Sequence, residues 1–151
     1  IFPLLYGGGQ EQSLRSGSEN LSGVVGLAEA CRIAAAERVS DARRISRLRD
    51  QLQATLQSIG CQVNCASTTR LPNHLSVTIP TGKANIVDAL NRRGIAVSSG
   101  SACSSRSQTE SHVLVALGFN SSQINRTIRI SLGRQTTKKE TEVIAQLVGR
   151  I

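Results

Sequence analysis

Cys103 is the residue of this chain whose surroundings best suit chemistry. It ends the run Ser98-Ser99-Gly100-Ser101-Ala102-Cys103, which follows a short apolar segment, 95–97, that we expect to be a strand. Small residues and a glycine give such a loop freedom to move. A thiolate carried by such a loop could act as a nucleophile. A surface loop with an incidental cysteine fits the same residues, so both interpretations stay open at this point.

Two further segments carry groups that could bind an anion. The alternation in 127–132 predicts a strand with Arg129 and Ser131 on the face opposite Ile128 and Ile130. An arginine on a central strand needs an anionic partner. Near the start of the chain, glycines at 7–9 and the run Arg15-Ser16-Gly17-Ser18 could supply donors to a phosphate. A glycine-rich linker that enters a helix explains that second segment equally well.

The elements that must position these groups alternate between helix and strand. Apolar spacing predicts one long helix, or two with a break near Val39-Ser40, over residues 21–59. A strand at 74–79 begins with His74, which we interpret as a structural histidine. Helices are expected at 84–93 and 109–117, and a capping box at Thr137 and Glu140 opens a last one. The sequence therefore predicts helices on a small sheet.

Length and composition limit the classes of protein to which this chain can belong. The chain has 151 residues, enough for one domain, and 2% aromatic residues, so its core must be aliphatic. No segment approaches the roughly 20 apolar residues of a membrane span, and no signal peptide opens the sequence. We therefore expect a cytoplasmic protein that does not contact a membrane. Because methionine is absent, we also expect the chain to be part of a longer protein.

Charge and cysteine content narrow the choice of partners. The net charge of +8 comes mainly from arginine and could attract anionic small molecules, acidic proteins or nucleic acid. We do not expect a nucleic-acid partner, because no binding motif and few stacking aromatics are present. Nor do Cys31, Cys61 and Cys65 predict disulfides or a metal site. Cys31 lies on an apolar helical face, so we expect it in the core.

Three motifs taken together resemble a known family. They are Gly7-Gly8-Gly9-Gln10-Glu11 with residues 15–18, the run ending in Cys103, and Ile128-Arg129-Ile130-Ser131-Leu132-Gly133-Arg134. In this order they resemble the C-terminal portion of cysteine desulfurases of the NifS/IscS type, which are class V aminotransferase-like enzymes that use pyridoxal 5'-phosphate (PLP). The resemblance covers essentially the whole chain. It implies an α/β fold in which a small mixed sheet with helices follows a long N-terminal helix, the α+β-like small domain of a fold-type I PLP enzyme.

The resemblance also implies a division of the chain and a set of site residues. Residues 1–20 would be the edge of the large domain, and 21–151 the small domain with its cysteine loop at 95–108. Cys103 matches the nucleophile that takes sulfur from L-cysteine as a persulfide, leaving L-alanine. Arg129 matches the arginine that holds the substrate α-carboxylate. Ser18 matches a hydroxyl that reaches the PLP phosphate of the other subunit in a homodimer.

One family feature is missing from this chain. The family's PLP lysine stands in a Ser-x-His-Lys context, which none of Lys83, Lys138 and Lys139 has. We therefore expect the chain alone to be inactive. The full-length protein would pass sulfur to an acceptor or scaffold protein for iron–sulfur cluster or thio-cofactor assembly.

Two alternatives stay open at the level of sequence. The same scaffold serves selenocysteine lyases and cystine-cleaving relatives. A sulfur-relay or interaction module that keeps the Cys103 loop without catalysis would carry the same motifs.

Overall fold

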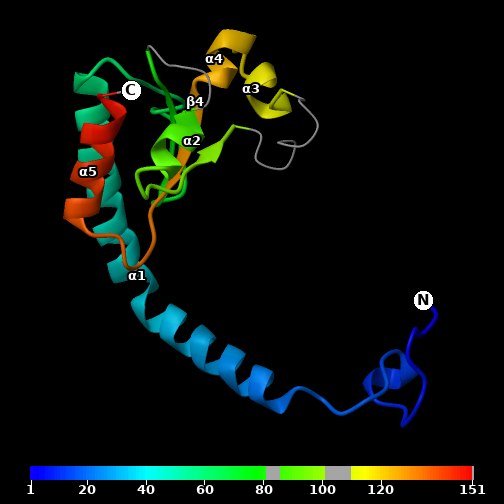
Figure 1. Cartoon of the computed structure of the whole chain (residues 1–151). Helices are drawn as coiled ribbons and strands as arrows, with labels where there is room; N and C mark the ends of the chain where they lie inside the picture. The colour runs from blue at the N-terminus through cyan, green and yellow to red at the C-terminus, as the bar shows by residue number, and fades with distance from the viewer. Residues whose placement is uncertain (81–85, 101–109, 151) are drawn as a thin grey trace. The chain divides into compact units, whose positions relative to one another are not determined.

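The computed structural model describes residues 1–80, 86–100 and 110–150. The chain forms two compact units, Ile1–Arg38 and Val39–Ile151 (Figure 1). Helix α1 (Leu21–Ser58) contributes residues to both units, and each unit is considered by itself below. The prediction of a helix over 21–59 is confirmed, in its unbroken form.

The first unit contains the short 3-10 helix η1 (Glu11–Ser13) and the first half of α1. Asn20 begins the long helix, because its side-chain Oδ1 accepts a hydrogen bond of 2.9 Å from the Gly23 amide. None of the apolar side chains in this unit is buried. The prediction that Cys31 lies in the core is therefore wrong, since Cys31 is exposed. The apolar stripe of this helical segment has no second layer in its own unit to cover it.

The second unit is built on a four-stranded sheet. Its order is β1-β2-β4-β3, formed by β1 (Gln62–Val63), β2 (His74–Thr78), β4 (Thr127–Ser131) and β3 (Ser98–Ser99). The predicted strands at 74–79 and 127–132 are confirmed. Every pairing is antiparallel, so the sheet is not mixed as expected. Residues 95–97, where a strand is expected, do not pair with the sheet, and pairing begins at Ser98 in β3.

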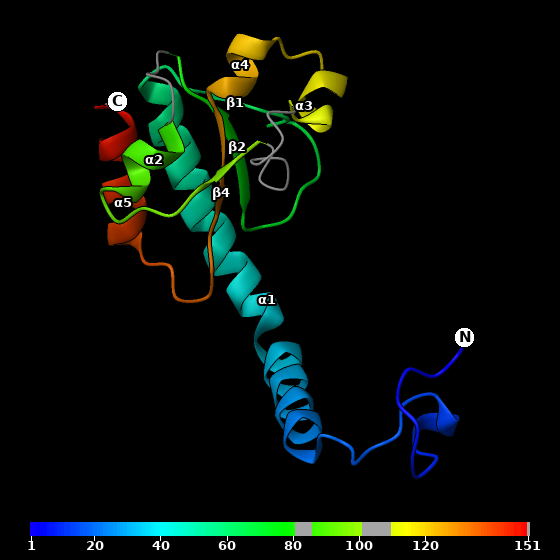
Figure 2. The ribbon, with the colours of Figure 1, turned by 45° about the vertical axis from the view of Figure 1, so that its right-hand side comes forward.

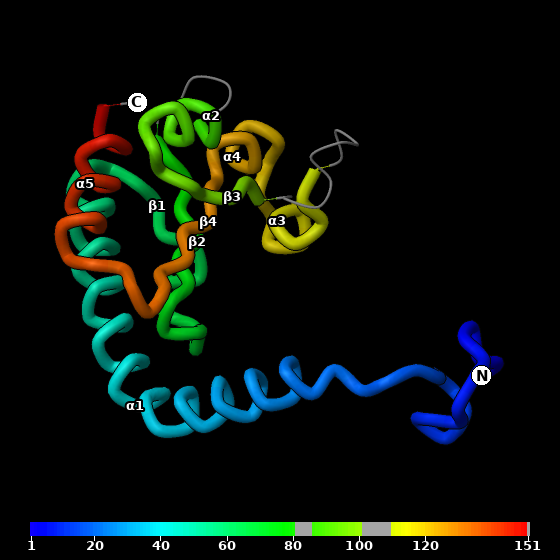
Figure 3. The backbone as a smooth tube through the Cα atoms, turned by 60° about the horizontal axis from the view of Figure 1, so that its bottom comes forward, coloured from blue at the N-terminus to red at the C-terminus, as the bar shows by residue number. Residues whose placement is uncertain are grey.

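Helices cover the sheet on both sides. Figure 1 and Figure 2 show α5 (Lys138–Val148) beside the second half of α1 on one side, with α3 (His112–Ala116) on the other. In Figure 3 the chain can be followed from β4 into α5, and α5 lies alongside α1. The other α-helices among the described residues are α2 (Ile86–Asn91) and α4 (Ser121–Asn125). The predicted capping box at Thr137 and Glu140 is present.

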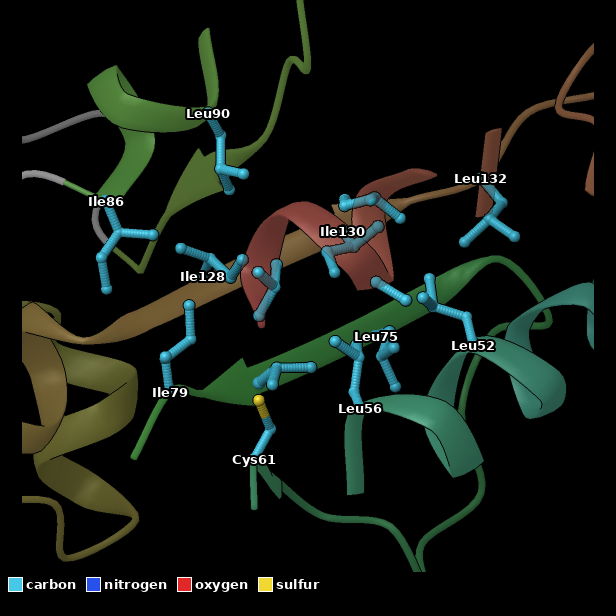
Figure 4. Close-up of a cluster of buried hydrophobic side chains, with 14 of the residues drawn as sticks. Leu52, Leu56, Cys61, Leu75, Ile79, Ile86, Leu90, Ile128, Ile130 and Leu132 are labelled. Carbon is cyan, nitrogen blue, oxygen red and sulfur yellow. The ribbon is translucent and has the colours of Figure 1, made fainter. Parts of the chain in front are cut away.

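Strand alternation divides the sheet into an apolar and a polar face. Leu75 is 0% exposed and Ile128 1%, and both belong to the core between the sheet, α1 and α5 (Figure 4). The side chains at the intervening positions, which include His74 and Arg129, lie on the opposite face. The helix expected at 109–117 is shorter than predicted. Of its apolar residues Leu114 is buried, whereas Val113 and Leu117 are exposed.

Charged side chains tie the turn after β4 to α1. Arg134, from the third motif, forms an ion pair of 2.9 Å with Asp41. Arg44 Nη1 donates a hydrogen bond of 2.9 Å to the Thr136 carbonyl. The last arginine of the motif therefore fastens the sheet to the long helix.

None of the helices in the described part of the chain combines the length and the apolar character that a membrane-spanning helix requires.

The buried face of β2 gives a first prediction. Leu75→Ala should lower the free energy of unfolding by about 2 to 5 kcal/mol, because it leaves a cavity in the centre of the core. Leu71→Ala is the matched control, since Leu71 is 70% exposed and its truncation should change stability by about 0.5 kcal/mol or less. Urea denaturation followed by circular dichroism measures both. Equal losses for the two variants would contradict the assignment of this face to the core.

Candidate anion-binding site beside the cysteine segment

A cavity of about 320 Å³ lies between the polar face of the sheet and α3. Strands β2 and β4 provide one wall and α3 another, and the turn after β1 closes a third side. Its lining includes two arginines, one histidine and several hydroxyl or amide side chains: Asn64, Thr68, Arg70, His74, Ser76, Ser111, Thr127 and Arg129. No aspartate or glutamate is among its described lining residues. The arrangement suits an anionic ligand.

Arg129 occupies the centre of this polar face. In the antiparallel register it stands opposite Ser76 on β2 and opposite Ser98 on β3. Its Nε donates a hydrogen bond of 3.3 Å to the Ser99 carbonyl, which is its one hydrogen-bond acceptor within the described residues. The other guanidinium donors are thus available to a planar anion such as a carboxylate.

A network of buried polar side chains lies next to Arg129 on the same face. Asn64 Nδ2 donates to Ser76 Oγ and to Thr78 Oγ1, both at 3.1 Å. The hydroxyls of Thr78 and Thr127 are 2.8 Å apart, and Thr127 Oγ1 donates to the Gln123 carbonyl at 2.8 Å. Linked hydrogen bonds of this kind hold each member in one rotamer. The network therefore fixes the floor of the cavity beside Arg129.

The described residues on either side of the cysteine segment also line this cavity. Cys103 itself lies outside the described residues, in the stretch 101–109. Gly100 precedes that stretch and Ser111 follows it closely, and both border the cavity that contains Arg129. A Cβ at position 100 would lie 2.6 Å from Leu114 Cδ1, so only glycine fits there without displacing the α3 side chain. The start of the cysteine segment is thus packed directly against α3.

His74 and Arg70 are site residues that sequence reasoning did not identify. Burial lowers the pKa of His74 below its ordinary value, and the positive charges of Arg129 and Arg70 lower this pKa further. Arg70 donates through Nη2 to Gln53 Oε1. The sequence predicts only a structural role for His74, because it does not give the strand register. That register places His74 opposite Ser131, on the same face as Arg129 and diagonal to it.

Ser18, the predicted phosphate contact, belongs to the first unit. It is exposed, and its carbonyl accepts a hydrogen bond of 2.9 Å from Arg15 Nη1. Arg15 Nη1 also donates to the Gly17 carbonyl at 3.0 Å, and the Gly17 amide donates to Gln10 Oε1 at 3.1 Å. Gly17 has a φ of 119°, a conformation that favours glycine. These contacts hold the segment 15–18 in a loop in which Ser18 is exposed.

No lysine lines the cavity in the described part of the chain. Lys138 and Lys139 begin α5, and Lys138 Nζ lies 3.7 Å from Glu142 Oε1. Lys83 falls outside the described residues. None of the described residues that line the cavity can therefore form an imine with an aldehyde. The described residues also contain no group of three or more His, Cys, Asp or Glu side chains that could hold a metal ion.

The environment of His74 predicts a pH dependence of stability. Because its pKa is lower in the folded than in the unfolded chain, the unfolded state binds the proton more tightly. Stability is therefore complete above the unfolded pKa of about 6.5 and decreases as the pH falls below it. His74→Gln should show a smaller fall in melting temperature between about pH 7.5 and about pH 5.5 than the parent. The control His112→Gln removes the other histidine, which is exposed, and should leave most of the fall in place. An unchanged fall in His74→Gln would contradict the assignment.

Comparison with known proteins agrees with the three motifs. The aminotransferase class-V family matches residues 5–144. A protein named cysteine desulfurase IscS from Methanosarcina thermophila is 39% identical over 153 residues, which cover 100% of this chain and 38% of the relative. A cysteine desulfurase from a Nostoc species is also 39% identical and is covered to 38%. The chain thus spans well under half the length of these relatives.

Comparison with solved structures points to the same family. A structure titled NifS-like protein matches 99% of this chain and 38% of its own with a TM-score of 0.79 and 34% identity. A NifS-like protein from Rickettsia africae matches 100% of this chain and 41% of its own with a TM-score of 0.79 and 28% identity. The expected α/β fold, with helices on a small sheet, is confirmed. The chain belongs to the aminotransferase class-V family, and its relatives there are cysteine desulfurases of the IscS and NifS type.

Proposed function

We propose that the whole protein of which this chain is a part is a cysteine desulfurase. The observation that carries the proposal is the cavity that Arg129 shares with Gly100 and Ser111, on either side of the segment with Cys103. Cys103 follows Gly100 by three residues, and three residues of chain span at most about 11 Å. The length of chain between Gly100 and Cys103 thus allows the thiol to reach a substrate bound to Arg129. The names of the relatives support the same activity.

The reaction needs two roles from the residues of this chain. Arg129 would bind the α-carboxylate of L-cysteine, because its guanidinium fork matches two carboxylate oxygens. Cys103 would attack the substrate sulfur as a thiolate, so that a sulfur–sulfur bond forms while the carbon–sulfur bond breaks. L-Alanine leaves and Cys103 keeps the sulfur as a persulfide. One thiol and one molecule of cysteine account for all atoms, and no external oxidant is required.

The cofactor that the family implies is PLP, and this chain supplies part of its surroundings. PLP would accept the electron pair while the carbon–sulfur bond of the substrate breaks. Ser18 would donate a hydrogen bond to its phosphate, which its exposed position in the loop 15–18 permits. The cavity has no lysine among its described residues, so we assign no anchor for PLP within the described part of the chain.

The remaining expectations are part of the same proposal. The protein would act as a homodimer in the cytoplasm, with Ser18 reaching the phosphate bound by the partner subunit. Residues 1–20 would form the edge of the large domain and 21–151 the small domain. The persulfide would pass to a thiol of an acceptor or scaffold protein in iron–sulfur cluster or thio-cofactor assembly.

Replacement of the thiol tests the central step. In the full-length protein, Cys103→Ser should lower alanine formation from L-cysteine at least about 100-fold, because the nucleophile is lost. Mass spectrometry should find one added sulfur atom on Cys103 of the parent and none in the variant. Cys65→Ser is the matched control, since Cys65 is an exposed cysteine that lines the same cavity. Equal alanine formation by parent and Cys103→Ser would refute the proposal.

Replacement of Arg129 tests the carboxylate contact separately. Arg129→Gln should raise the KM for L-cysteine about tenfold or more, since hydrogen bonds to charged groups contribute about 1.5–3 kcal/mol. Arg92→Gln removes an equal charge from an exposed position outside the cavity and should leave KM within about twofold. Steady-state alanine assays on both variants make the comparison. A KM that is the same in Arg129→Gln and the parent would remove Arg129 from the substrate site.

A further inference from the structure

Ser76 lies beside Arg129 on the polar face of the sheet. The register of β2 and β4 pairs these two residues directly, and both are half-buried and line the cavity. Directly paired residues of an antiparallel sheet have Cβ atoms about 4.5–5.5 Å apart and point to the same side. A ligand in this cavity therefore meets both side chains.

Asn64 holds Ser76 through its backbone and its side chain. The Asn64 amide donates a hydrogen bond of 2.9 Å to the Ser76 carbonyl, and Asn64 Nδ2 donates one of 3.1 Å to Ser76 Oγ. Asn64 is only 5% exposed, and its carboxamide is fixed in turn by the Thr78 hydroxyl. The Ser76 hydroxyl is thus attached to a buried network by its oxygen atom.

The proton of the Ser76 hydroxyl is available to a ligand. A serine hydroxyl can accept and donate at the same time, and this one accepts from Asn64. None of the hydrogen bonds between described residues uses its O–H as the donor. Because the Asn64 amide group occupies the side of the oxygen that faces the network, the O–H points away from that network. An anion in the cavity would provide its acceptor.

Arg129 and Ser76 approach such an anion from two sides. Arg129 Nε donates to the Ser99 carbonyl, which draws the arginine side chain toward β3. Strand β4 lies between β2 and β3 in the sheet. A carboxylate above β4 would therefore have the free guanidinium donors on its β3 side and the Ser76 hydroxyl on its β2 side.

We propose that Ser76 is a second donor to the substrate carboxylate and that Asn64 is the residue that positions it. Arg129 supplies the positive charge, and the Ser76 O–H donates to a carboxylate oxygen that the guanidinium leaves free. The presence of an α-carboxylate on Arg129 rests on the proposed function. A hydrogen bond to an ionised acceptor is roughly twice as strong as one between neutral groups. Ser76 would therefore favour ligands that carry the carboxylate over ligands that lack it.

Two ligands that differ only in the carboxylate test this contact. S-Methyl-L-cysteine carries it, and S-methylcysteamine has a hydrogen atom in its place. Isothermal titration calorimetry is performed on the full-length protein with its cofactor. Ser76→Ala should bind S-methyl-L-cysteine about tenfold more weakly than the parent, as expected for the loss of one hydrogen bond to a charged group. Its affinity for S-methylcysteamine should stay within about twofold, because that ligand offers the hydroxyl no anionic acceptor.

Ser98→Ala is the matched control. Ser98 stands opposite Arg129 on β3, but it is exposed and does not line the cavity. Both affinities of this variant should therefore stay within about twofold of the parent. Ser76→Thr keeps the O–H donor and should bind S-methyl-L-cysteine within about threefold of the parent.

Melting temperatures of all variants are measured first. If Ser76→Ala is unfolded, Ser76→Cys replaces it, because a thiol has nearly the same shape and is a weak donor. An unchanged affinity of the folded variant for S-methyl-L-cysteine would overturn the proposal. So would an equal loss for both ligands, or a loss in Ser76→Thr as large as that in Ser76→Ala, since either result would trace the effect to packing.

Failure of this proposal is distinguishable from failure of the proposed function. If the Ser76 contact is wrong but the function holds, S-methyl-L-cysteine loses affinity in Arg129→Gln and not in Ser76→Ala, and Cys103 still gains sulfur. If the function is wrong but the contact holds, no sulfur is found on Cys103, whereas Ser76→Ala still loses affinity for S-methyl-L-cysteine alone.

Discussion

The antiparallel register between β2 and β4 is the constraint on which the site depends. It pairs Leu75 with Ile130 and Val77 with Ile128, which places these apolar side chains in the core. The same register sets Ser76 opposite Arg129 on the other face. A shift by one residue would exchange the two faces and bury the arginine against α1 and α5. The hydrophobic core therefore determines where the guanidinium lies.

The polar face of the sheet is ordered by hydrogen bonds rather than by apolar packing. Asn64, Ser76, Thr78 and Thr127 satisfy one another through hydrogen bonds of 2.8 to 3.2 Å. A buried polar network contributes little net stability when complete and is strongly destabilising when one member is removed. This face therefore keeps a polar surface next to Arg129 where an apolar one would exclude an anion.

The spacing of apolar residues and the capping residues predicted those elements that depend on residues close together in the sequence. The long helix, the strands at 74–79 and 127–132 and the capping box at Thr137 follow from periodicity and capping chemistry, and each is present. Alternation also placed Arg129 on the face away from Ile128. The position of His74 on the same face as Arg129 could not be predicted, because it depends on pairing between strands some fifty residues apart. Cys31 was misplaced because an apolar stripe does not show what covers it.

Gly100 links the cysteine segment to α3 in a way that restricts how this protein can change over time. The space that a side chain at position 100 would need is occupied by Leu114, which is itself 5% exposed. A residue larger than glycine can enter only if the Leu114 side chain moves, and in a buried position such a movement carries a packing cost. The residue at position 114 therefore influences which residues position 100 can accept. The helix α3 and the start of the cysteine segment are in this sense packed as one part.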